Sequence, residues 1–219
     1  MADTTPGRSP LAGAAARLAA ASRASRGAVR LAELPFLAQL DVRTDAKGAA
    51  ADAVGLALGV PLPLEPNTAV RAGPSAVLWL GPDEWLVVGP PGTGGGLEHR
   101  IRAAAGRGVV AVTDVSARRT TLLVGGPRAR DLLAHGCALD LHPRAFADGQ
   151  CAQTTLARVQ VVLVAGPGAG CRVLVGASYA GHLADWLLDA ATEYAGGLSE
   201  PGRAVRAYPP GPSTGTASR

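Results

Sequence analysis

The stretch that decides the fold class reads Ala76-Val77-Leu78-Trp79-Leu80-Gly81-Pro82-Asp83-Glu84-Trp85-Leu86-Val87-Val88. Two runs of apolar, strand-forming residues flank the turn residues Gly81-Pro82-Asp83, and this pattern predicts a β-hairpin. Trp79 and Trp85 occupy positions of equal parity, so both indoles are expected on one face of the hairpin. Tryptophan at such positions indicates a core or an interface anchor rather than a cofactor site.

A second hairpin is predicted further along the chain. The runs Val159–Val164 and Arg172–Val175 flank the turn residues Gly166-Pro167-Gly168. A helix is expected from Tyr179, because apolar residues then recur at helical spacing on one face. These are Tyr179, Leu183, Trp186, Leu187, Ala190 and Tyr194.

The remaining pattern predicts strands over 37–43, 109–115 and 119–124 and helices over 49–58, 97–105 and 128–135. A hairpin followed by a helix therefore occurs twice, with an earlier helix before each hairpin. We expect an α+β fold of two similar helix–hairpin–helix halves, not a regular parallel sheet. The halves are expected over about 31–108 and 109–199 of a single domain. Disordered tails are expected over 1–30, which is rich in Ala and Arg, and 200–219, which is rich in Pro, Gly and Ser.

The charge distribution argues against nucleic-acid binding. The chain has 219 residues and a net charge of +4, but residues 1–30 alone contribute +4 and residues 200–219 contribute +2. The body between them is slightly acidic, whereas a nucleic-acid-binding fold carries its basic stripe on the folded surface. Within the body, residues 100–172 hold ten basic and four acidic side chains, a polarity that suits docking against a complementary partner.

Membrane association and secretion are also not expected. Arginines interrupt every apolar run near the N-terminus, and no stretch approaches the ~18 apolar residues of a spanning helix. Cys137, Cys151 and Cys171 form an odd set without CxxC spacing, which favours reduced thiols and a cytoplasmic location.

Several motifs that suggest chemistry lack its essential groups. The segment Gly89–Gly96 follows a strand and precedes a helix, but it has neither the Lys nor the Ser/Thr of a phosphate-binding loop. Ser178 lies at a strand-to-helix turn without the downstream acid and base of a hydrolase, and it is interpreted as a helix cap. The soft ligands His135, Cys137, His142 and Cys151 match no common zinc spacing. Asp83-Glu84 and Asp114 are interpreted as turn, capping or ion-pairing carboxylates.

Four stretches together resemble a known family. They are Leu80–Leu86 (LGPDEWL), Asp114–Thr120 (DVSARRT), Gly126–Leu133 (GPRARDLL) and the most distinctive run, Gly136–Thr154. This set resembles the gamma subunit of bacterial heterotetrameric sarcosine oxidase over about residues 31–195.

The resemblance implies a place in a complex of alpha, beta, gamma and delta subunits. Such a complex oxidises the N-methyl group of sarcosine to give glycine and hydrogen peroxide, and it transfers the one-carbon unit to tetrahydrofolate. FAD, FMN, NAD and tetrahydrofolate are then expected in the alpha and beta subunits and zinc in delta, with no cofactor in this chain. The fold is expected to resemble the folate-binding domain of aminomethyltransferases. Those enzymes carry a catalytic Asp in a turn that corresponds here to about Thr155–Val159, which has no carboxylate.

Two functions therefore follow from the sequence. The first is a non-catalytic gamma subunit, and the alternative is a stand-alone folate- or one-carbon-binding module of the aminomethyltransferase type. For the first, the expected interface lies in the arginine-rich region, because arginine forks pair with partner carboxylates. Its candidate residues are Arg118, Arg119, Arg128, Arg130, His142 and Arg144, each of which could equally be solvated or paired locally.

Overall fold

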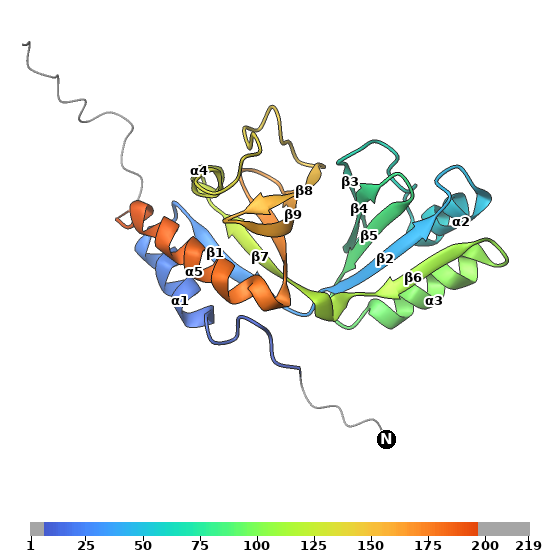
Figure 1. Ribbon diagram of the computed structural model, residues 1–219, viewed down its shortest axis with the longest axis horizontal. Coiled ribbons are helices and arrows are strands. Elements are labelled where there is room, and N and C mark those ends of the chain that lie inside the picture. Colours follow the sequence, from blue (N-terminus) through green and yellow to red (C-terminus); the bar gives the residue numbers. More distant parts are fainter. Residues whose placement is uncertain (1–6, 197–219) are drawn as a thin grey trace, which may run out of the picture.

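The computed structural model describes residues 7–196 and consists of two antiparallel sheets that lie side by side, with helices on their outer sides (Figure 1). The sheet we call sheet A has the strand order β1 (Arg30–Leu34), β7 (Arg119–Gly125), β10 (Cys171–Gly176), β9 (Val159–Ala165) and β8 (Cys151–Leu156). Sheet B has the order β3 (Ala69–Ala72), β4 (Ser75–Gly81), β5 (Glu84–Gly89), β2 (Ala38–Thr44) and β6 (Val110–Asp114). The expected mixed α+β class is confirmed.

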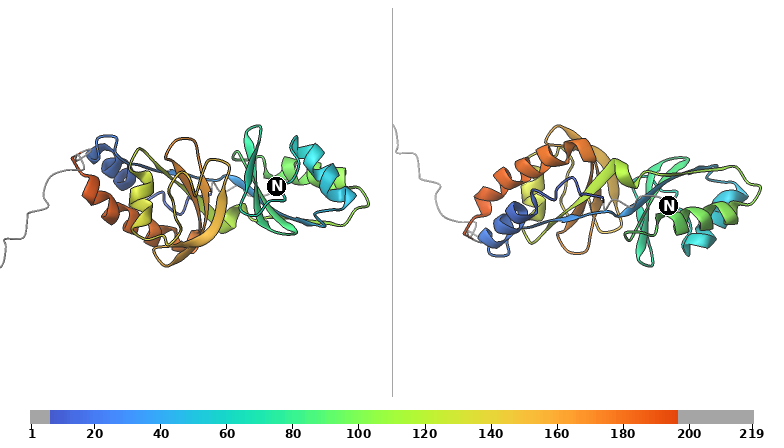
Figure 2. Two further views of the ribbon diagram at one scale, coloured as in Figure 1. Left: turned by 90° about the horizontal axis from the view of Figure 1, so that it is seen from above. Right: turned by 90° about the horizontal axis from the view of Figure 1, so that it is seen from below.

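The helices divide between the two sheets. Sheet A packs with α1 (Ala15–Ala24), α4 (Ala129–Ala134) and α5 (Ala180–Ala190), and sheet B with α2 (Ala49–Leu58) and α3 (Gly94–Ala105). Short 3₁₀ turns η1 (Ser116–Arg118), η2 (Ala177–Tyr179) and η3 (Ala191–Tyr194) complete the described elements. The views from above and below show the two helical layers at opposite ends of the elongated molecule (Figure 2). Among the described residues, no helix has the length and apolar character needed to cross a membrane.

The predicted boundary between the halves is wrong, because the two sheets exchange strands. Strand β1 precedes β2 in the chain but belongs to sheet A, where it pairs with β7. Strand β6 follows the predicted boundary at 108 but belongs to sheet B, where it pairs with β2. The chain therefore crosses between the sheets twice, at 35–37 and at 115–118, and the two crossings lie side by side at the base of the molecule (Figure 1).

The two predicted hairpins are present at the predicted places. Strands β4 and β5 pair with Trp79 opposite Trp85, and both indoles belong to the core of sheet B. Trp85 is fully buried, and its indole N–H donates to the Pro63 carbonyl oxygen at 2.7 Å. A buried indole with a satisfied N–H is the expected arrangement for a core tryptophan. Strands β9 and β10 form the second hairpin.

The prediction of disorder over 1–30 is wrong for residues 7–30. Helix α1 and the residues before it bury Leu11, Ala14 and Leu18 in the core of sheet A, against α5. The apolar stripe is narrow, but alanine-rich helices pack closely, so three residues are enough to bury one face. The Ser22 hydroxyl accepts a hydrogen bond from the Leu31 N–H at 2.8 Å and thereby joins α1 to β1. The predicted tail over 200–219 lies outside the described residues.

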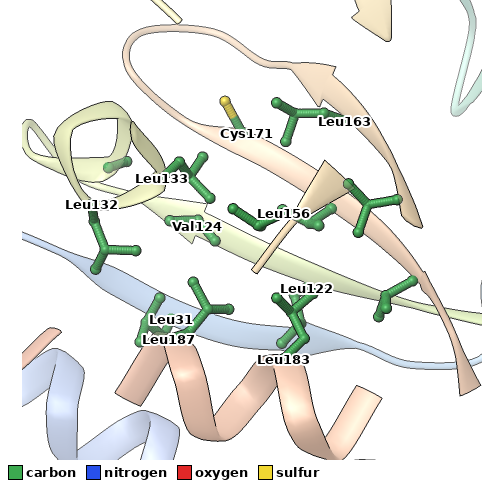
Figure 3. Close-up of a cluster of buried hydrophobic side chains, with 14 of the residues drawn as sticks. Leu31, Leu122, Val124, Leu132, Leu133, Leu156, Leu163, Cys171, Leu183 and Leu187 are labelled. Carbon is green, nitrogen blue, oxygen red and sulfur yellow. The ribbon is translucent and has the colours of Figure 1, made fainter. Parts of the chain in front are cut away.

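The core of sheet A is continuous from α5 through the strands to α4. Leu183 and Leu187 of α5 approach the sheet from one side, and Leu132 and Leu133 of α4 approach from another (Figure 3). All four leucines are fully buried. A separate cluster joins the two sheets: Leu78, Leu80, Leu86 and Val88 of sheet B contact Cys151, Val162 and Leu174 of sheet A. This inter-sheet cluster fixes the sheets against each other through apolar contact.

We expect Leu18→Ala to lower the free energy of unfolding by about 3 kcal/mol, because the side chain is 1% exposed and its removal leaves a cavity. The matched control is Leu56→Ala, also within a helix but 85% exposed, for which a change near zero is expected. Both values are obtained from chemical denaturation of the full chain. Equal effects for the two variants would show that α1 is not part of the folded core.

Candidate functional site

A polar cavity of about 800 Å³ lies against strands β8, β9 and β10 of sheet A. We call it the arginine cavity, because three arginines line it: Arg118, Arg119 and Arg158. The apolar part of its wall includes Val162 and Leu174, which also belong to the inter-sheet cluster. The cavity therefore lies at the border of the contact between the sheets. The other lining residues are Gln153, Thr154, Thr155, Val159, Gln160, Val161, Gly176, Ser178 and Tyr179.

The crossing at 115–118 positions two of the three arginines. Arg118 ends the 3₁₀ turn η1, and Arg119 begins β7. The turn is held in place by Gln39 of β2: its N–H donates to the Ser116 hydroxyl at 2.9 Å, and its carbonyl accepts from the Val115 N–H at 2.8 Å. The Gln39 side chain is buried and donates to the Arg119 carbonyl. The two arginines thus extend from a rigid junction between the sheets.

The third arginine lies in the tight turn between β8 and β9. Ala157 and Arg158 have φ angles of 51° and 67°, and Leu156 pairs with Val159 across the turn. Two consecutive residues with positive φ define a two-residue hairpin turn that normally selects Asn and Gly. Neither residue here relieves the steric cost of that conformation. This turn lies within Thr155–Val159, the segment expected to correspond to the catalytic turn of aminomethyltransferases, and it has two residues between the paired Leu156 and Val159.

The electrostatic surroundings of the cavity are positive. Burial, followed by the neighbouring charge of Arg118, lowers the pKa of Arg119, while Asp41 and Glu84 oppose this effect. Glu84 already forms an ion pair with Arg43, with 2.5 Å between Arg43 Nη2 and Glu84 Oε2. Among residues 7–196, none of the three cavity arginines forms an ion pair within 4.0 Å, and none of the residues lining the cavity is Asp or Glu.

Polar contacts across the sheet interface hold the wall of the cavity. The Gln153 amide of β8 donates to the Leu80 carbonyl of β4 at 2.9 Å. Cys151, also on β8, is fully buried, and its thiol donates to the Thr68 carbonyl at 3.3 Å. The thiol also lies 3.5 Å from the Trp79 carbonyl. Burial raises the pKa of Cys151 to about 11, and the hydrogen bond with the Trp79 backbone lowers it by a smaller amount. Cys151 is thus a structural thiol in its neutral form.

The remaining predicted interface residues lie at the start of α4, on α4 and in the loop after it, not at the cavity. Arg130 is buried, and its guanidinium donates to the carbonyls of Leu141 and Phe146, at 2.5 and 2.6 Å. The structure therefore corrects the interface prediction for Arg130, which instead holds its own loop. Arg128 pairs locally with Asp131 at 2.9 Å, as the alternative interpretation allowed.

His142 and Arg144 are exposed in that loop. The His142 ring nitrogen Nδ1 accepts from the Arg144 N–H at 3.2 Å, so this part of the loop is ordered by its own hydrogen bonds. Both residues remain candidates for a partner contact.

The other motifs fit structural interpretations. All three cysteines are free and buried, and within residues 7–196 no three His, Cys, Asp or Glu side chains are grouped to hold a metal ion. Asp114 accepts a hydrogen bond from the Ser116 N–H at 2.8 Å and so stabilises the crossing turn. The expected capping by Ser178 is wrong: Ser178 lies within η2, and neither η2 nor α5 has a side-chain cap. Glycines 94–96 form the first turn of α3.

An apolar groove of about 410 Å³ lies at the end of α2, on sheet B's side of the molecule. We call it the α2 groove. Leu56 and Leu64 line it and are 85% and 60% exposed. The other lining residues are Ala46, Ala51, Asp52, Gly55, Gly59, Val60, Pro61 and Leu62. The apolar periodicity of α2 buries Val54 and Leu58 and leaves Leu56 exposed. A leucine outside the apolar face of the helix was the sequence signal that could have predicted this exposed apolar surface.

The arrangement of two sheets is shared with a known class of protein. The aminomethyltransferase T of the glycine cleavage system from Bartonella henselae superposes with a TM-score of 0.60 at 14% identity, covering 78% of this chain and 48% of that chain. At this identity the likeness shows the fold alone. The chain thus has an aminomethyltransferase-like fold in which the residues lining the cavity include no carboxylate.

The particular family follows from closer relatives. Residues 43–193 match the model of the sarcosine oxidase gamma subunit family, and the chain belongs to that family. The sarcosine oxidase gamma subunit of an Arthrobacter species is 40% identical over 189 residues, covering 86% of this chain and 91% of the relative. The corresponding protein of Corynebacterium sp. strain P-1 is 38% identical, covering 90% and 95%. A chain of the heterotetrameric sarcosine oxidase from Corynebacterium sp. U-96 superposes with a TM-score of 0.81 at 35% identity, covering 88% of this chain and 98% of that chain.

We expect Cys151 to resist alkylation by iodoacetamide at pH 8 in the native chain and to react in denaturant, because the thiolate is the reactive form.

The folded state favours the neutral Cys151 thiol, so this residue's contribution to stability is complete below its ordinary pKa of 9.0 and is lost as the pH rises through about 11. The Cys151→Ala variant should therefore show a smaller loss of unfolding free energy between pH 9 and 11. Rapid native labelling at Cys151, located by peptide mass spectrometry, would contradict its burial.

Proposed function

We propose that this chain is the non-catalytic gamma subunit of a cytoplasmic heterotetrameric sarcosine oxidase. Its partners are then alpha, beta and delta subunits, and the complex converts sarcosine to glycine and hydrogen peroxide with transfer of the one-carbon unit to tetrahydrofolate. FAD, FMN, NAD, tetrahydrofolate and zinc belong to the other subunits in this proposal. The reduced state of all three cysteines is consistent with the cytoplasm.

The observation that carries the non-catalytic role is the β8–β9 turn. Where aminomethyltransferases are expected to present a catalytic Asp, this chain presents Ala157 and Arg158. A site that loses its charged acceptor loses most of its affinity for the corresponding donor. The residues present therefore do not fit a folate-based transfer reaction. Nor do the described side chains provide a donor set for zinc.

The α2 groove supports a role in assembly. Leu56 and Leu64 expose apolar surface beside a hollow that is itself lined mainly by small and apolar residues. Contiguous exposed apolar surface on a folded protein marks a binding surface, because its burial is favourable once a partner covers it. A partner subunit in the complex is the occupant that this proposal assigns to the groove.

The double variant Leu56→Glu/Leu64→Glu should fail to join the complex, because two carboxylates would be desolvated in an apolar contact. The chain is co-expressed with the three candidate subunits, and co-elution is followed by size exclusion and flavin absorbance. The control is Val109→Glu, a residue that is 89% exposed but does not line the groove. Undiminished co-elution of the double variant would remove the groove from the interface. If the three other subunits form an active flavoenzyme without this chain, that result would contradict its role as a structural subunit.

Calorimetry distinguishes the gamma-subunit function from the alternative function, a stand-alone folate-binding module. We expect no saturable heat when tetrahydrofolate is titrated into the free chain, since the described cavity residues offer no carboxylate to the pterin ring. The same titration into the assembled complex serves as the positive control. Saturable binding to the free chain would favour the alternative.

A further inference from the structure

The arginine cavity concentrates positive charge without a counter-charge from the lining residues. Arg118 and Arg119 are adjacent in sequence, and Arg158 lines the same hollow from the β8–β9 turn. Arg43 and Arg102, by comparison, form ion pairs with Glu84 and Glu98. Arg118 repels the neighbouring charge of Arg119, and the carboxylates of Asp41 and Glu84 oppose that effect; an anion in the cavity would oppose it further.

The cavity arginines are held in positions that have a conformational or electrostatic cost. Arg119 is half-buried, and burial together with Arg118 lowers its pKa, so its charge is poorly solvated. Arg158 adopts a positive φ of 67°, which a non-glycine residue adopts at a steric cost. Costs of this kind are common where a side chain is held ready for a ligand.

The other lining groups match a protein surface rather than a small charged ligand alone. Tyr179 is 58% exposed at the cavity, and Val162 and Leu174 provide an apolar wall. Gln160 and Ser178 add exposed hydrogen-bonding groups. Arginine and tyrosine around an apolar centre are the residue types that dominate the energy of protein interfaces. Arginine pairs bidentately with carboxylates, which specifies the charge of the partner.

We propose that the arginine cavity receives an acidic segment of a partner subunit, whose Asp or Glu side chains pair with Arg118, Arg119 and Arg158. This inference rests on the proposed function, since the segment comes from another chain of the complex. It extends the predicted interface at Arg118 and Arg119 to Arg158. It also assigns the interaction to a hollow beside the inter-sheet contact rather than to α4.

The test measures assembly of the complex with charge-reversal variants. Arg119→Glu and Arg158→Glu are each expected to weaken association at least about tenfold, the loss of one charge-assisted hydrogen bond or more. Arg158→Lys, which keeps the charge but not the fork, should fall between wild type and Arg158→Glu. The control is Arg172→Glu, an exposed arginine on β10 that does not line the cavity. Association is measured by co-elution with the flavin-containing complex over a series of NaCl concentrations.

The salt series provides an independent signature, because exposed charge pairs are screened by ions. Wild-type association should weaken with added salt, and the Arg158→Glu variant should lose much of that dependence. Denaturation curves check folding, and Arg158 is exposed, so its reversal should leave the free energy of unfolding nearly unchanged.

The outcomes separate the two proposals. If wild type fails to co-elute with the other subunits, the proposed function fails. If wild type, Arg119→Glu and Arg158→Glu all associate as Arg172→Glu does, the function stands and the acidic-segment proposal is overturned. Saturable tetrahydrofolate binding to the free chain that is lost in Arg158→Glu would also overturn it, because the arginines would then serve a small-molecule site.

Discussion

The exchange of strands between the sheets is the constraint on which the rest of the structure depends. Residues 30–44 and 110–125 form an antiparallel pair that runs through both sheets, with β1 against β7 at one end and β2 against β6 at the other. Neither sheet is completed by a contiguous piece of the chain. At the crossing, the backbone of Gln39 bonds to Val115 and Ser116, and its buried side chain reaches the Arg119 carbonyl. Buried polar groups are costly unless paired, so the hydrogen bonds of the Gln39 backbone and amide nitrogen favour this geometry of the junction. The buried amide oxygen of Gln39 has no hydrogen-bond partner among the described residues.

The junction determines the position of the arginine side chains that follow it. Because Arg118 and Arg119 follow the crossing directly, they emerge at the border between the sheets. The inter-sheet cluster brings β8 against β4, where Gln153 and Cys151 donate hydrogen bonds to carbonyls of the other sheet. Arg158, in the β8–β9 turn, lines the same cavity. Arg158 thus lines one cavity with the sequence-distant pair Arg118 and Arg119 as a consequence of the topology.

Local patterns in the sequence predicted local structure well. Of the predicted turn residues, Gly81 ends β4, and Pro82 and Asp83 lie between β4 and β5. Helix α2 is followed by its C-cap Gly59, which has the positive φ that glycine allows. Strand β8 was not predicted, because Cys151–Leu156 mixes buried and exposed residues without a regular alternation. The strand exchange was equally out of reach, since pairing between residues as far apart in sequence as Arg30 and Gly125, or Thr44 and Val110, leaves no periodic mark in either strand. The two predicted cavity arginines were found through composition, whereas Arg158 required knowledge of the β8–β9 turn.

The contrast between fold and site explains how an aminomethyltransferase-like fold can carry a β8–β9 turn without a carboxylate. The core of sheet A depends on apolar side chains such as Leu122, Leu163 and Leu187, which are fully buried, whereas Arg158 of the turn is exposed. A two-residue turn carrying Ala157 and Arg158 closes the β8–β9 hairpin as well as a turn with a carboxylate would, apart from its strained φ angles. The sign of the charge at that turn can therefore change with little effect on folding. A carboxylate there suits a cationic or hydrogen-bond-donating substrate, whereas a guanidinium suits an anionic partner.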